Sequence, residues 1–206
     1  DQARSDAASH MYHALLESVN GTAAGDKDFT QTKSKAEEII NEYGGTTYAQ
    51  FAALYLAKLA AEEGDLDEAQ NQLRWVLSKA AAKSDIAEIA QLRLARVLAA
   101  SSDTDQALNI LNAGQAGAYA ASYAIAKGDI YMQLGRDDEA GMAYASARIS
   151  LMENGISGSV ATLDQKIQSL NPIPSRVLDE GAELESATAE QPVEKDTVDT
   201  LVNQEG

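Results

Sequence analysis

The sequence contains no cysteine, very little proline and few aromatic residues. Without cysteine there is no disulfide, no thiolate metal site and no cysteine nucleophile. All three prolines, Pro172, Pro174 and Pro192, follow residue 171, so no proline breaks a helix before that point. Aromatic residues make up 5% of a chain that is 45% hydrophobic, so alanine and leucine are expected to fill the core. Together these features predict an all-α body.

Positive charge is also scarce. The chain has 16 Lys and Arg against 32 Asp and Glu, a net charge of −16. Because nucleic-acid binding needs clustered Lys and Arg, we expect no nucleic-acid partner. No run of 18 apolar residues is present, so no transmembrane helix is predicted within this sequence. Residues 175–206 contain nine acidic and two basic residues and few large apolar ones, which predicts a disordered acidic tail over residues 172–206.

Apolar residues recur at helical spacing in the first third of the chain. The spacing predicts helices over about residues 4–19, 29–43 and 47–63, the last two ending at glycines. Residues 1–45 are therefore predicted to form an N-terminal helical pair, as a degenerate repeat or a cap. A helix over about residues 160–170 is predicted to cap the other end.

A short motif occurs three times in the middle of the chain. The copies "GDLDEA", "SDTDQA" and "GRDDEA" begin at Gly64, Ser102 and Gly135, separated by 38 and 33 residues. Tetratricopeptide repeats are helical hairpins with a period of about 34 residues. Each copy fits the bend of such a hairpin: Gly can adopt the left-handed conformation that closes the first helix, and the next residue can cap the second.

The expected caps differ among the copies. Asp65 with Glu68, and Asp103 with Gln106, have the spacing of a capping box. In the third copy arginine occupies the cap position, so Asp137 is predicted to cap one residue later.

Alignment on these bends also brings small residues into register. Small or modest residues recur seven residues before, five after and twelve after the start of each motif: Ala57, Ala95 and Gly128; Ala69, Ala107 and Ala140; Val76, Gly114 and Ala147. Small residues at fixed positions allow close helix packing. Residues 46–171 are thus predicted to be tetratricopeptide-like repeats plus the C-terminal capping helix, a helical hairpin solenoid; an unrelated alanine-rich bundle is the alternative.

Stacked hairpins present a concave surface lined by the first helix of each pair. Counting fixed positions along these helices predicts a groove for a peptide or partner, made by Phe51, Leu54, Lys58, Ile89, Leu92, Arg96, Ile125, Asp129 and Met132. Apolar side chains would supply contact area, and Lys58 and Arg96 would bind a carboxylate. The alternative is that several of these apolar residues only pack against neighbouring helices.

Few residues suggest chemistry. His10, His13 and Glu17 lie on neighbouring helical turns and could hold a metal ion, which makes a metal-dependent enzyme the alternative of another class. Two surface histidines near a chain end are the simpler interpretation. We find no catalytic motif and predict no enzyme activity, no cofactor and no metal. Trp75 is predicted either to pack between repeats or to be an exposed contact.

Several stretches between about residues 7 and 170 resemble one family, the YfgM-like ancillary subunit of the bacterial SecYEG translocon. They are "ASHMYHALL", "YAQFAALYLAKLAAEEGDLDEAQNQLRWVL", "IAQLRLARVL", "DQALNIL", "KGDIYMQLGRDDEAGMAYASA" and "LDQKIQSL". Of these, "LRLARVL" and "GDIYMQLG" are the most specific.

The resemblance implies a place and partners. It implies a periplasmic domain on the inner membrane, held by an N-terminal single-pass anchor that would precede Asp1. Its implied partners are the SecYEG translocon, a membrane-anchored periplasmic peptidyl-prolyl isomerase and secreted polypeptides, which it would help pass to periplasmic chaperones. It brings no catalytic residues. A repeat scaffold for envelope assembly or stress signalling is the nearest alternative.

Overall fold

The computed structural model describes residues 2–22, of which the last three as backbone only, and residues 29–114, 117–156, 158 and 160–170. The predicted tail over residues 172–206 lies outside these residues. The helices in chain order are α1 (Gln2–Thr22), α2 (Thr30–Tyr43), α3 (Thr47–Glu63), α4 (Leu66–Lys79), α5 (Asp85–Ala100), α6 (Thr104–Ala113), the 3₁₀ turn η1 (Gly117–Tyr119), α7 (Ala120–Gln133), α8 (Asp137–Glu153) and α9 (Val160–Leu170). No strand occurs among the described residues, which confirms the all-α prediction.

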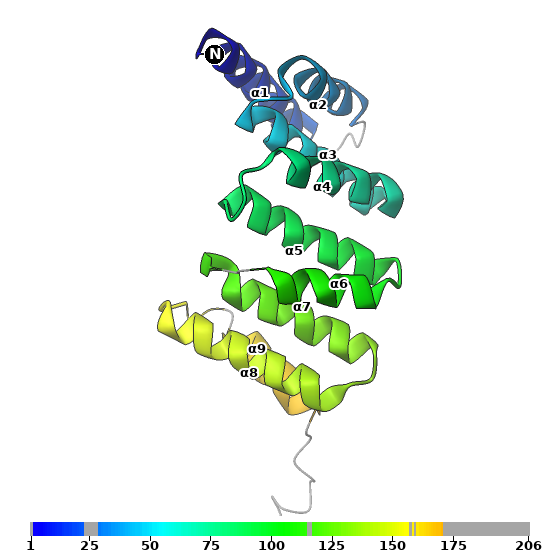
Figure 1. Ribbon diagram of the computed structural model, residues 1–206, viewed down its shortest axis with the longest axis vertical. Helices are drawn as coiled ribbons and strands as arrows, with labels where there is room; N and C mark the ends of the chain where they lie inside the picture. The colour runs from blue at the N-terminus through cyan, green and yellow to red at the C-terminus, as the bar shows by residue number, and fades with distance from the viewer. Residues whose placement is uncertain (1, 23–28, 115–116, 157, 159, 171–206) are drawn as a thin grey trace, which may run out of the picture. The chain divides into compact units, whose positions relative to one another are not determined.

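The helices form hairpins that stack in chain order (Figure 1). The pairs α1–α2, α3–α4, α5–α6 and α7–α8 each pack together, and α9 packs on α8. Each hairpin also contacts the next one, through α2 and α3, α4 and α5, and α6 and α7. Contacts between sequence neighbours are the defining property of a solenoid.

The three predicted bends share one backbone conformation. Gly64, Ser102 and Gly135 all have positive φ, at 82°, 68° and 68°. In each bend the N–H of the next residue donates to the carbonyl five residues back, as Asp65 does to Ala60 at 2.8 Å. This is the Schellman ending of a helix. The motif therefore recurs because each hairpin needs the same left-handed residue.

The aspartates at the first two bends act as helix caps. Asp65 Oδ1 accepts a hydrogen bond from the Glu68 N–H at 3.0 Å, and Asp103 Oδ1 accepts one from the Gln106 N–H at 3.3 Å. The reciprocal half of the expected capping box does not form in this described region, because the Asp65 N–H already donates to the Ala60 carbonyl. The predicted boxes are therefore single caps.

At the third bend the prediction of a cap at Asp137 is wrong. Asp137 is the first residue of α8, and Arg136 is the capping residue, without a side-chain hydrogen bond to the helix. Instead, the Arg136 guanidinium bonds the Glu139 carboxylate and lies 4.7 Å from the Tyr131 ring centroid. Acidic residues in the first turn of α8 stabilise the helix, because they lie at the positive end of its dipole.

Ser102 is the natural place to test the left-handed bend. Replacing Ser102 with glycine is expected to raise the free energy of unfolding by about 0.5–1 kcal/mol, because a residue with a side chain is strained at positive φ. Urea unfolding followed by circular dichroism would measure this change. The matched control is Ser101→Gly, where φ is −86° and glycine should destabilise; a loss of stability in both variants would contradict the interpretation.

Three apolar clusters follow one another along the stack. The largest joins α3 to α7, a second joins α1, α2 and α3 around Leu15 and Ile39, and a third joins α7, α8 and α9 around Tyr144 and Leu163. Thus α1–α2 and α9 cover the two ends of the repeats. Trp75 is half-buried and packs against the first two clusters, which favours the inter-repeat role over an exposed contact.

One aligned small residue lies outside its helix. Val76 and Ala147 are fully buried within helices, but α6 ends at Ala113 and Gly114 follows it. A Cβ at Gly114 would lie 2.6 Å from Cε1 of Tyr123. The small residue is thus required by the Tyr123 ring, even though the helix has ended.

Candidate functional site

Two of the predicted groove residues meet at a cavity between the first two repeats. Lys58 from α3 and Arg96 from α5 both line it, and its volume is about 370 Å³. The full lining is Ala57, Lys58, Ala61, Glu62, Leu73, Arg93, Arg96 and Val97. A hollow with an apolar lining and a few polar groups is the usual form of a ligand site.

The floor of the cavity belongs to the core. Ala57 is 2% exposed, Leu73 from α4 is 1% exposed, and Val97 is also buried. These side chains are fixed by the packing of α3, α4 and α5 in the largest cluster. The floor is therefore a preformed apolar surface.

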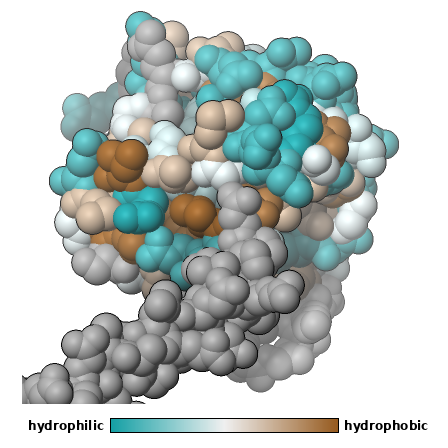
Figure 2. All heavy atoms as spheres, turned by 90° about the horizontal axis from the view of Figure 1, so that it is seen from below, coloured by the Kyte–Doolittle hydropathy of each residue, from teal (hydrophilic) through white to brown (hydrophobic). Residues whose placement is uncertain are grey.

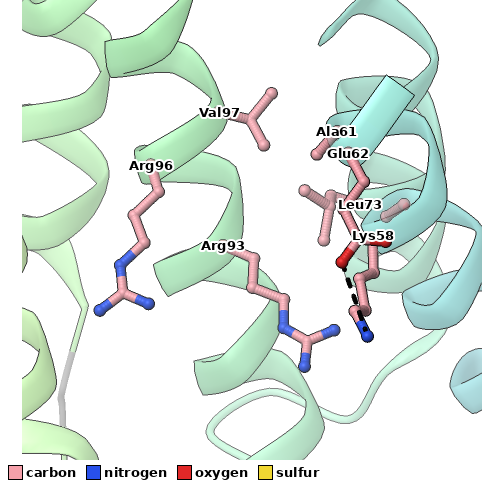
Figure 3. A pocket seen from close by; sticks show the side chains of 8 residues that line it. Lys58, Ala61, Glu62, Leu73, Arg93, Arg96 and Val97 are labelled. Atoms are coloured by element: carbon pink, nitrogen blue, oxygen red, sulfur yellow. Dashed lines mark ion pairs between the residues drawn. The ribbon is translucent and has the colours of Figure 1, made fainter. Parts of the chain in front are cut away.

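Charged groups surround this floor (Figure 3). Lys58 pairs with Glu62 one turn later, at 3.6 Å, and both side chains are more than half exposed. Arg93 donates from Nη1 to the Leu54 carbonyl at 3.2 Å. Arg96 extends from the same helix as Arg93, one turn further along (Figure 3). The lining thus holds three cations and one carboxylate.

The two arginines leave positive charge uncompensated. Neither Arg93 nor Arg96 has an ion pair among the described residues. Partial burial, and then repulsion from Arg96, lower the pKa of Arg93. Like charges held side by side in a chain of net charge −16 make a local attraction for an anion. An arginine fork suits a carboxylate in particular.

The other groove residues of the first two repeats serve mainly in packing. Leu54 and Leu92 are each 7% exposed, within the largest cluster. Phe51 and Ile89 are partly buried against the same cluster. For these four residues the structure shows the packing alternative, although the Leu54 carbonyl still orients Arg93.

The groove residues of the third repeat are not brought to this cavity. Ile125 packs in the cluster that α9 completes. Asp129 accepts a hydrogen bond from the Tyr144 hydroxyl at 2.7 Å and forms an ion pair with Lys166 of α9. Met132 is 40% exposed and does not line the cavity. The cavity is lined by residues of α3, α4 and α5, whereas these three residues lie on α7, two of them against α9.

Arg93 is the cation of the cavity that the predicted groove did not include. It directly follows Leu92, at a position not included in the count. Arg93 and Arg96 are three residues apart, so they share one helix face. That spacing of two arginines in an acidic chain is the signal that could have identified the site.

The proposed histidine site gathers no ligands in the described residues. His10, His13 and Glu17 are exposed on α1. In the part of the chain that the structure describes, no group of three or more His, Cys, Asp or Glu residues is placed to hold a metal ion. Within the same residues, no helix combines the length and apolar content needed to span a membrane.

A model of the tetratricopeptide repeat-like domain matches residues 1–172. No curated protein and no solved structure matches the chain. The match covers all of the described helices, the cavity included.

Proposed function

We propose that this chain, which belongs to the tetratricopeptide repeat-like domain family, binds polypeptides at the cavity between α3 and α5. We also propose that it is not an enzyme. A helical repeat fold of this kind is typical of protein-interaction modules. The observation that supports the site is the pair Arg93 and Arg96, uncompensated beside a buried apolar floor. We call this site the cationic cavity.

The chemistry of the cationic cavity defines the ligand. A carboxylate would pair with Arg96, assisted by the positive charge of Arg93 and Lys58, and the neighbouring apolar side chain would lie over Leu73 and Val97. Such a ligand is a polypeptide segment in which an acidic group adjoins an apolar residue. Attraction between the cations and the segment would also speed association, and salt would weaken it.

Reversing two charges tests the cavity. The double variant Lys58→Glu and Arg96→Glu is expected to weaken binding of a fluorescent synthetic peptide of alternating leucine and glutamate by roughly 10- to 100-fold. Both side chains are exposed, so the fold should persist. Fluorescence anisotropy at low salt would measure the affinity.

The control is a charge reversal of equal size elsewhere. Lys79 and Lys83 are exposed and do not line the cationic cavity, so changing both to glutamate should reduce affinity by less than about threefold, through net charge alone. Equal losses in the two double variants, or unchanged affinity in the first, would remove the cationic cavity as the binding site.

We also propose a narrower role, as the periplasmic domain of a membrane-anchored translocon-associated protein. It would connect SecYEG and a membrane-anchored peptidyl-prolyl isomerase with periplasmic chaperones, and so assist newly secreted polypeptides. The sequence resemblance around "LRLARVL" and "GDIYMQLG" supports this role. The first stretch includes Arg93 and Arg96, so the resemblance overlaps the cationic cavity.

In-cell crosslinking tests the narrower role. A photoreactive residue at Lys58 or Arg96 is expected to capture translocon subunits, the isomerase or secreted polypeptides, identified by mass spectrometry. Adducts with envelope assembly or stress-signalling proteins instead would favour the scaffold alternative. Adducts with cytosolic proteins alone would overturn both the compartment and the role.

A further inference from the structure

The last hairpin exposes an apolar row along α8. Met142, Ile149 and Met152 are 65%, 58% and 60% exposed, and Ala145 between them is also exposed. Their spacing is three, four and three residues, which places all four on one side of the helix. Figure 2 views the molecule from its α8 and α9 end and shows apolar side chains among hydrophilic ones. We call these four residues the α8 seam.

The α8 seam departs from the pattern of the other repeats. The position of Met142 is seven residues after the glycine or serine that starts each bend. At this position α4 has Asn71 and α6 has Asn109, and both are exposed. Fourteen residues after, α4 has the exposed Ser78 where α8 has Ile149. Because α4 and α6 stack with polar side chains there, the hairpin does not need apolar ones for folding. Large apolar side chains grouped on an exposed face point to a binding surface.

The spacing of the α8 seam suits a helical partner. Alternating steps of three and four residues form the narrow row along which two helices pack. Met142 and Met152 are about 15 Å apart along the axis, roughly three helical turns. Methionine side chains are flexible and adapt to different partners. A helix with one apolar stripe is the complementary surface.

Charge at both ends of the α8 seam selects the partner further. Asp138 lies one turn before Met142, and Glu153 directly follows Met152; both are exposed and have no ion pair among the described residues. Arg148, beside the seam, is paired with Asp164 at 3.5 Å. The remaining charge at the two ends is negative and attracts basic residues.

The same charges disfavour two other occupants. A second copy of the chain also has a net charge of −16, so two copies repel each other. An anionic membrane surface would be repelled by Asp138 and Glu153.

We propose that the α8 seam binds an amphipathic helix of another protein, with Lys or Arg residues flanking its apolar stripe. This surface is separate from the cationic cavity, which lies between α3 and α5, so the domain can hold a helical partner and an acidic segment at the same time. The two sites have opposite charge and select different ligands.

The test uses two synthetic helical peptides and the whole chain. Both peptides have leucine at the two apolar heptad positions; one has lysine at the flanking positions and the other has glutamate. The lysine peptide is expected to bind at least ten times more tightly than the glutamate peptide in fluorescence anisotropy, and added salt should weaken it. Equal binding of the two peptides to the chain with Lys58→Glu and Arg96→Glu, in which the cationic cavity no longer attracts the glutamate peptide, would overturn the proposal. No binding of the lysine peptide would overturn it as well.

Variants locate the binding site. The double variant Met142→Asn and Ile149→Ser introduces the residues that α4 has at these positions, and it is expected to reduce lysine-peptide affinity at least tenfold. The control Leu134→Asn removes an apolar side chain that is 40% exposed outside the seam and should leave the affinity unchanged. Equal effects of these variants would overturn the proposal.

Two further measurements separate the alternatives. Sedimentation of the chain alone should show no self-association that depends on Met142 and Ile149. Vesicles containing anionic lipid should likewise not bind the chain through these two residues. Either result in the opposite sense would assign the α8 seam to a second copy or to lipid. Charge reversal of Lys58 and Arg96 should not weaken binding of the lysine peptide, so failure at one site does not imply failure at the other.

Discussion

Replacing Gly128 with alanine is expected to lower the free energy of unfolding by about 1–3 kcal/mol. A Cβ at this position would lie 2.4 Å from Cε1 and 2.6 Å from Cδ1 of Tyr144. The Tyr144 ring cannot move away easily, because it is 2% exposed and its hydroxyl is held by Asp129. The clash outweighs the gain of about 1 kcal/mol that alanine brings to a helix interior.

The other repeats show how the clash could be relieved. At the positions of Gly128 and Tyr144, the first repeat has Ala57 and Leu73. In the first repeat the larger residue on the first helix, Ala57, thus faces the smaller residue on the second helix, Leu73. The double variant Gly128→Ala and Tyr144→Leu is expected to recover part of the lost stability. Urea unfolding followed by circular dichroism would measure each variant.

A second glycine in the same hairpin is the matched control. Gly141 is inside α8, and a Cβ there would meet only Leu170 Cδ1 at 3.8 Å, an ordinary contact. Gly141→Ala should therefore stabilise the domain by about 0.5–1 kcal/mol. If Gly128→Ala stabilised it too, close packing against Tyr144 would not be the reason for glycine at 128.

Stability is expected to fall by about 2 kcal/mol between pH 10 and pH 12 through Tyr123 alone. Burial, and then the nearby charge of Glu88, raise the pKa of Tyr123 to about 12. The Tyr123 hydroxyl donates a hydrogen bond to the backbone carbonyl of Glu88 at 2.9 Å, and its oxygen lies 3.1 Å from Gln91 Oε1. An unfolded tyrosine loses its proton near pH 10, so above that pH the unfolded chain holds fewer protons and becomes relatively more stable.

The folded chain has further tyrosines of this kind. Burial, and then the hydrogen bond to Asp129, raise the pKa of Tyr144 as well. Burial raises the pKa of Tyr12 and of Tyr55. The contribution of each is fully present below pH 10 and is lost as pH rises through the folded-state pKa. The alkaline side of the stability curve should therefore be steep.

A phenylalanine variant isolates the contribution of Tyr123. At pH 8, Tyr123→Phe is expected to cost about 1 kcal/mol for the lost hydrogen bond. Between pH 10 and pH 12 the native chain should lose stability faster than the variant, so their difference should shrink or reverse. Denaturant unfolding at several pH values would measure both curves. Parallel curves over this range would show that Tyr123 does not titrate differently in the folded state.

Much of the fold was predictable because its signals are local. The left-handed bends at Gly64 and Gly135 depend only on neighbouring backbone atoms, so a short sequence motif is enough to predict them. The helix over 47–63 ends before Gly64 as predicted, and the helix over 160–170 lies where it was predicted. By contrast, the expected cap at Asp137 does not form: Arg136 takes the cap position, where its guanidinium has no acceptor for a backbone N–H and instead contacts Glu139 and the Tyr131 ring.

The candidate site was predictable only in part. Fixed positions on the repeat identified Lys58 and Arg96, which do share a cavity. They did not identify Arg93, whose guanidinium reaches a backbone carbonyl of α3 from α5. Nor could they show that Lys166 would pair with Asp129 across 37 residues of sequence. Contacts at such separations depend on how successive hairpins are rotated against each other.

The sequence by itself determined the all-α class, the three hairpin bends and the acidic character of the chain, because helix periodicity, left-handed bends and net charge are properties of short segments and of composition. Only the tertiary structure decided which helix faces stay open. It covers the third repeat with α9, leaves the cationic cavity open between α3 and α5, and leaves the α8 seam without a covering helix. The physical reason is that a side chain's exposure depends on what packs against it from other hairpins.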